Sequence, residues 1–70
     1  MDKQMTKGQI VSSLSSIAGL YEIGLITGNE KAILINDLRN GRPLDQNIMA
    51  KVERAATSSF EKDLIALLYY

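Results

Sequence analysis

The segment LYEIGLITGNEKAILINDLRNGRP, residues 20–43, constrains the fold most strongly because it contains both the start and the stop of one helix. Thr27 and Glu30 form a T-x-x-E capping box, in which each side chain accepts a hydrogen bond from the other residue's backbone N–H. Gly41 follows the apolar run where a left-handed cap residue is favoured, and a proline comes two residues later. This pattern predicts a helix over about residues 28–40.

A second helix is predicted upstream of this segment. Thr6 and Gln9 form another capping-box match, so the helix should run over about residues 7–23 and end near Gly24. Apolar residues recur on one face at spacings of four, three and four, as in an amphipathic helix: Ile10, Leu14, Ile17 and Tyr21.

The C-terminal part of the chain contains two more helix-start signals. Asp45 follows a turn and is the expected N-cap of a third helix. Ser58 and Glu61 form a third capping-box match, which favours a break and a fourth helix from about Ser59. An almost unbroken apolar stripe also allows one long helix over residues 46–70, and we favour the break.

These elements predict an all-α fold, a compact bundle of three or four short helices with a helical hairpin at its centre. Residues 1–70 should form a single domain, with residues 1–5 frayed. A chain this short buries only about 60% of the surface that its unfolded form exposes. It has no cysteine or histidine for a disulfide or a zinc site, so we expect support from dimerisation. The predicted core consists of Ile10, Leu14, Ile17, Tyr21, Ile26, Leu34, Ile35, Leu38, Ile48, Met49, Val52, Phe60, Leu64 and Leu68.

Charge and hydropathy argue against two classes of partner. Eight basic residues balance eight acidic ones, and no charged tail would attract nucleic acid or a membrane surface. No apolar run approaches the ~20 residues of a membrane span, and the N-terminus is polar. We therefore expect a cytoplasmic protein that binds another protein, itself or both, and no membrane.

The outer face of the first predicted helix is unusual because no charged residue lies between Lys7 and Glu22. This face is either a serine-rich exposed surface or a place where another helix packs closely. Ile33, on the side of its helix away from the predicted core, is either a tolerated exposed residue or part of a second contact surface. The terminal tyrosines either pack on the core or contact a partner. The candidate protein interface comprises Ser12, Ser16, Gly19, Ile33, Tyr69 and Tyr70.

Catalytic chemistry has little support in this sequence. Without histidine or cysteine, the commonest bases, nucleophiles and metal ligands are missing. The eight acidic residues are scattered, and several occupy helix-start positions. We predict no catalytic residue, no metal site and no cofactor.

The segment from Ile35 to Leu44, INDLRNGRPL, contains an I-x-x-L-x-N-G-R pattern. It resembles the end of the recognition helix and the following turn in helix-turn-helix domains of the Cro/repressor type. The resemblance covers about a third of the chain and implies DNA binding, with Lys31, Arg39 and Arg42 as the nearby cations. The position of the base-reading surface, however, carries Ala32, Ile33 and Leu34, whereas base edges are read by polar side chains.

We therefore predict a small, non-enzymatic regulatory or adaptor protein that acts through its helix surfaces. Small regulators of bacterial or phage type share this size and class. A DNA-binding transcriptional regulator is the alternative.

Overall fold

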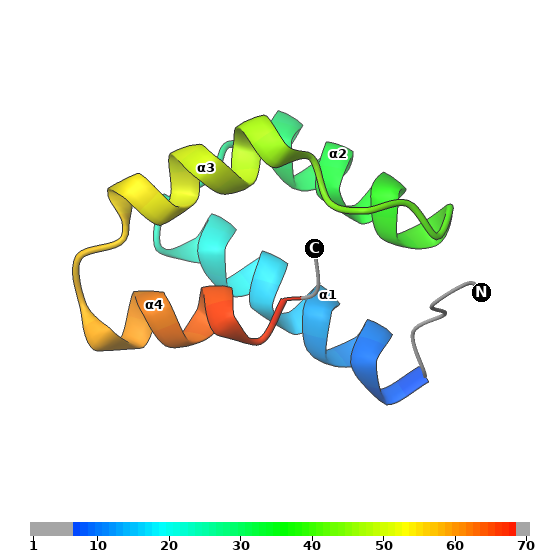
Figure 1. Ribbon diagram of the computed structural model, residues 1–70, viewed down its shortest axis with the longest axis horizontal. Coiled ribbons are helices and arrows are strands. Elements are labelled where there is room, and N and C mark those ends of the chain that lie inside the picture. The colour runs from blue at the N-terminus through cyan, green and yellow to red at the C-terminus, as the bar shows by residue number, and fades with distance from the viewer. Residues whose placement is uncertain (1–6, 69–70) are drawn as a thin grey trace.

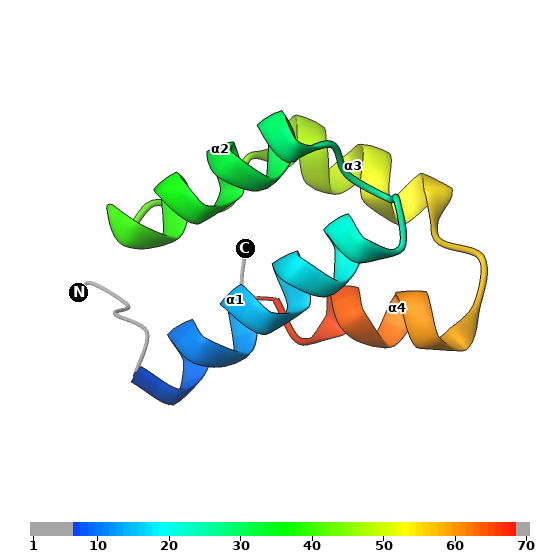
Figure 2. The same ribbon diagram turned by 180° about the vertical axis from the view of Figure 1, so that it is seen from behind.

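The computed structural model describes residues 7–68, which form four helices and no strand (Figure 1). These helices are α1 (Lys7–Glu22), α2 (Gly28–Arg39), α3 (Gln46–Ala55) and α4 (Ser59–Ala66). The chain reverses direction at each connection. Figure 1 shows α3 and α4 in front of α2 and α1, and Figure 2 shows the same arrangement from behind. The predicted all-α class is confirmed for the described part of the chain.

Side-chain caps begin three of the helices at the predicted residues. The Glu30 N–H donates to Thr27 Oγ1 at 3.1 Å, and the Thr27 N–H donates to Glu30 Oε1 at 2.9 Å. Ser58 and Glu61 form the same reciprocal box before α4, and Asp45 caps α3. The break between α3 and α4 is therefore confirmed, and the alternative of one long C-terminal helix is wrong. The predicted cap at Thr6 lies outside the described residues.

Two glycines allow the chain to leave its helices. Gly24 and Gly41 have φ angles of +85° and +66°, a conformation that is strained for residues with a side chain. The first helix ends at Glu22, one residue earlier than predicted, and Asn40 is the C-cap of α2 rather than its last residue. These small differences are ordinary for helix ends.

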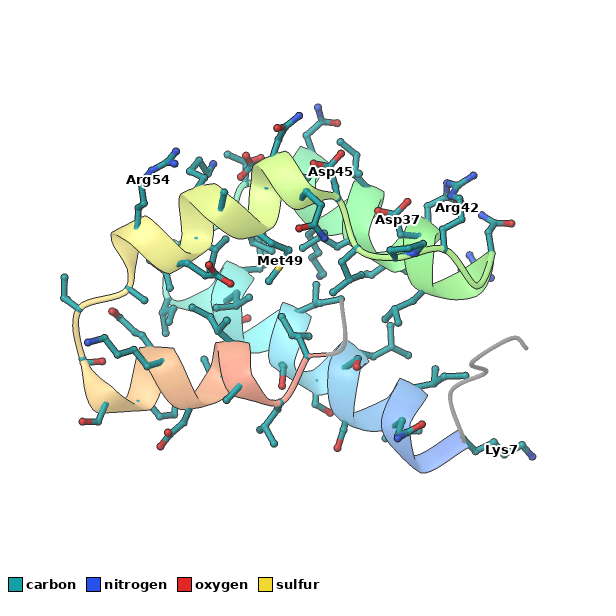
Figure 3. All side chains as sticks on the ribbon, in the orientation of Figure 1. Lys7, Asp37, Arg42, Asp45, Met49 and Arg54 are labelled. Atoms are coloured by element: carbon teal, nitrogen blue, oxygen red, sulfur yellow. The ribbon has the colours of Figure 1, made fainter. Side chains whose placement is uncertain are left out.

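The core lies between the two pairs of helices and draws side chains from all four. Met49, for example, points from α3 toward the centre of the molecule (Figure 3). Predicted core residues Leu14, Ile35 and Leu64 are half-buried and pack against the buried cluster, and Ile10 is also half-buried. The buried apolar residues are Ile17, Leu20, Ile26, Leu34, Leu38, Leu44, Ile48, Met49, Val52, Ala56, Ile65 and Leu68.

Two predicted core residues are wrong, since Tyr21 is 43% exposed and Phe60 is 61% exposed. Tyr21 lies at the edge of α1 toward α2, where its ring faces a lysine. Phe60 is predicted to be in the core because it continues the apolar stripe of α3. Ala56, however, has an extended backbone, so the residues of α4 do not continue the helical periodicity of α3. Four buried apolar residues were not in the predicted core: Leu20, Leu44, Ala56 and Ile65.

Candidate interaction surfaces

The uncharged side of α1 is partly a helix–helix contact within the chain itself. Ser13 and Ser16 are buried on α1, which packs against both α2 and α4. A Cβ added at Gly19 would lie 3.3 Å from Leu64 Cδ1, so the absence of a side chain there allows α4 to come close. Of the predicted interface residues, Ser16 therefore lies in the interior and Gly19 faces α4. A partner could not reach Ser16 without opening the fold, and Leu64 of α4 lies against Gly19.

A second part of the same region remains exposed and apolar. Val11, Phe60 and Leu67 are 62%, 61% and 53% exposed, more than any other large apolar side chain in the described residues. Phe60 and Leu67 stand four residues before and three residues after Leu64, so they share the face of α4 that lies beside α1. We call Val11, Ser12, Ser15, Phe60 and Leu67 the α1–α4 surface.

The turn between α2 and α3 is organised by Asp37, which the sequence analysis did not single out. Asp37 is buried, and its Oδ2 accepts a hydrogen bond from the Asp45 N–H at 3.0 Å. Its Oδ1 lies 3.4 Å from Arg42 Nη2, and its backbone carbonyl accepts from the Arg42 N–H at 2.9 Å. Figure 3 shows the three side chains gathered at this end of the molecule. One carboxylate thus ties the end of α2 to the start of α3.

The position of Asp37 in the sequence was a signal for its role in the turn between α2 and α3. Asp37 stands three residues after Leu34 and one before Leu38, so helical periodicity places it at the margin of the buried face of α2. An acidic residue in that position needs partners, because an unpaired buried charge is costly.

Two of the three cations considered for DNA binding have partners within the fold. Arg42 pairs with Asp37, and the Lys31 ammonium lies 4.7 Å from the centre of the Tyr21 ring in a cation–π contact. Arg39 is exposed and has no ion pair within residues 7–68. The structure therefore does not bring these cations together as one free basic cluster.

The first turn of α2 is joined to α3 by an ion pair between Glu30 and Lys51, which is also a hydrogen bond. The Lys51 ammonium, followed by the Thr27 backbone N–H, lowers the pKa of Glu30 below its ordinary value. The backbone N–H groups of Thr57 and Ser58 likewise lower the pKa of Glu61. Glu30 is thus held in its charged form first by Lys51 and then by its cap, and Glu61 is held so by its cap.

The remaining predicted interface residues lie apart from the α1–α4 surface. Ile33 is 40% exposed on α2, where its neighbours on the solvent side are polar. Tyr69 and Tyr70 lie outside the described residues. Other exposed side chains on this face of α2 are Asn29, Ala32, Asn36, Arg39 and Asn40.

The described residues contain no group of three or more acidic side chains that could hold a metal ion. Among helices α1 to α4, none combines the length and the apolar character that a membrane span requires. Comparison of the chain with protein-family models, with curated proteins and with solved structures finds no match.

Proposed function

We propose that this protein is a small, non-enzymatic adaptor or regulator that binds another protein through its helix surfaces in the cytoplasm. The observation that carries this proposal is the α1–α4 surface. An isolated exposed apolar residue needs no explanation, but a group of them on adjacent helices is typical of an interaction site. Phe60 and Leu67 are two such residues on α4 beside its contact with α1, and Val11 is exposed on the side of α1 without charge.

The chemistry of the polar residues supports a binding role over catalysis. Glu30, Asp45 and Glu61 are engaged by the helix starts that they cap, and Asp37 is engaged by the turn between α2 and α3. Carboxylates held in this way serve the fold. The helical hairpin of α1 and α2 then acts as a scaffold that supports the contact surface on the other side of α1.

The proposal is tested by affinity capture from lysate of the native host, with and without nuclease, followed by mass spectrometry. We expect a stoichiometric protein partner that survives nuclease and is lost with the variant Phe60→Ser/Leu67→Ser. The matched control is Ala32→Ser on the exposed side of α2. Far-UV circular dichroism of each variant verifies that the helices persist. Retention of the partner by the double variant would contradict the proposal.

DNA binding is the second candidate, and one structural observation favours it. Asp37 is turned inward, so the exposed side of α2 carries Asn29, Asn36, Arg39 and Asn40 without an acidic residue. Asparagine and arginine side chains are suited to base edges. The structure weakens this candidate elsewhere, because Asn40 Nδ2 already donates to Asn36 Oδ1 at 3.1 Å and the free cations are few.

The DNA candidate has its own test. Fluorescence anisotropy of a labelled duplex at low salt should report binding that is weakened by Arg39→Ala and by added salt. Loss of the captured proteins on nuclease treatment would favour this candidate over the adaptor.

A further inference from the structure

The side of α1 that faces away from the core has a charge pattern that matches itself in the opposite direction. Lys7 and Glu22 stand at the two ends of the helix, and both are exposed and without an ion pair in the described residues. Lys7, Val11, Ser15, Ala18 and Glu22 follow one another at spacings of four, four, three and four, so they form a single stripe. This stripe is opposite the buried residues of α1.

If a second copy of α1 packed antiparallel against this stripe, Lys7 of each copy would lie opposite Glu22 of the other copy. The contact would therefore contain two such pairs. The midpoint of that pairing falls between Leu14 and Ser15, which also places Val11 opposite Ala18 of the other copy. A two-fold axis produces such a self-complementary contact by necessity. Small residues at the centre of the stripe allow the two helix backbones to come close.

The exposed part of α4 extends this contact. Leu64 lies beside Gly19, and α4 runs back along α1 in the opposite direction (Figure 1). Three residues further, Leu67 reaches the level of Ser16, about one residue from the midpoint of the pairing. Leu67 of each copy therefore lies near the two-fold axis, where it can be covered by its counterpart.

We infer that the α1–α4 surface binds a second copy of this chain in an antiparallel, two-fold arrangement centred on α1. This inference rests on the proposed role of that surface in protein binding and names its occupant. The 16 residues of α1 span about 24 Å and the 8 residues of α4 span about 12 Å, and each helix is about 10 Å wide. Such a face covers about 360 Å² on each chain, or about 720 Å² in total, which is below the size of a standard interface and typical of a weak contact.

An interface this small predicts a weak dimer that forms only at high micromolar concentrations of the chain. Sedimentation equilibrium of the full chain should therefore show a monomer–dimer equilibrium between about 1 µM and about 1 mM. The variant Lys7→Glu places like charges at both ends and should weaken the dimer roughly tenfold. The exchange Lys7→Glu/Glu22→Lys should restore dimerisation to within about a factor of three, because it recreates both pairs.

Because the sequence contains no cysteine, crosslinking gives a clean second measurement. Ser15→Cys, next to the midpoint, should yield a covalent dimer with a short bis-maleimide reagent. Ala32→Cys, which is also exposed but lies on α2, is the matched control and should remain monomeric.

The inference is overturned by a monomer throughout the concentration range, by failure of the charge exchange to restore the dimer, or by equal crosslinking of the two cysteine variants. None of these three results by itself contradicts the proposed function. A monomer that still loses its captured partner with Phe60→Ser/Leu67→Ser would retain the adaptor role and lose only the second copy as occupant.

Discussion

Replacing Asp37 tests the structure most directly, because one carboxylate joins the end of α2 to the start of α3. Asp37→Ala removes the acceptor for the Asp45 N–H and the partner of Arg42. A hydrogen bond to a charged group contributes about 2 kcal/mol, and a pair with an exposed arginine contributes about 0.5 kcal/mol. Two gains offset this loss: alanine is the better helix former by about 0.6 kcal/mol, and removing a negative charge near the C-terminus of α2 returns about 0.5 kcal/mol.

The balance is a loss of about 1.4 kcal/mol in the free energy of unfolding. Urea denaturation followed by far-UV circular dichroism measures this loss. For a domain of this size the urea dependence is about 1 kcal/mol per molar, so the midpoint should fall by about 1.4 M with an unchanged slope. The melting temperature should fall by about 6 to 11 °C.

Two further variants separate the causes. Asp37→Asn retains an oxygen that can accept from the Asp45 N–H, so it should lose less than Asp37→Ala does. Arg42→Ala removes only the exposed ion pair and should cost less than about 1 kcal/mol. Asp63→Ala, an exposed change on α4, is the control, because it makes the same gain in helix propensity without losing a hydrogen bond, so it should not destabilise the protein. A loss with Arg42→Ala as large as that with Asp37→Ala would refute the assignment, because the ion pair rather than the backbone bond would then hold the turn.

Two other predictions concern the polar groups of the helices. The pKa values of Glu30 and Glu61 are lowered on folding, so the unfolded chain binds protons first as the solution is acidified. The stability that these carboxylates contribute is present above the pKa of glutamate in the unfolded chain, about 4.3, and should decline as the pH falls below that value. Thermal melts at several pH values measure this decline. Glutamine at both positions can still serve a capping box but does not titrate, so it should remove the share of the decline that the two carboxylates cause. A pH profile that is unchanged in this variant would contradict their role. The Ser13 hydroxyl is fully buried without a hydrogen-bond partner among the described residues. Ser13→Ala should therefore stabilise the protein by about 1 kcal/mol. The control Ser12→Ala changes an exposed serine and should stabilise the protein by about 0.5 kcal/mol. Equal effects of the two changes would mean that the Ser13 hydroxyl is satisfied in solution.

Local signals in the sequence were sufficient to place the helices. Capping boxes at Thr27 and Ser58, the cap at Asp45 and the glycines after α1 and α2 predicted the boundaries to within one or two residues. Such signals act over three or four neighbouring residues, and their hydrogen bonds form within a single helical turn. The sequence therefore also predicted the break before α4 against a nearly continuous apolar stripe.

Helical periodicity was less reliable for the core. It correctly placed Ile17, Leu34 and Val52 inside, because each lies at the centre of an apolar stripe. Tyr21 and Phe60 lie at the margin of a stripe, where burial depends on which neighbouring helix covers that side. Periodicity defines the faces of one helix but contains no information about the position of the next helix.

The sequence by itself determined that residues 7–68 are helical, where α2, α3 and α4 begin, where α1 and α2 end to within a residue, and that α1 has a side without charge. Only the tertiary structure decided the use of that side: Ser16 is buried and α4 approaches Gly19, while Val11 remains exposed. It also decided that Asp37 joins α2 to α3 and engages Arg42. The physical reason is the separation along the chain between the residues that interact. Caps and turns depend on residues next to one another in the chain, whereas burial and charge pairing depend on contacts between helices that become neighbours only after folding.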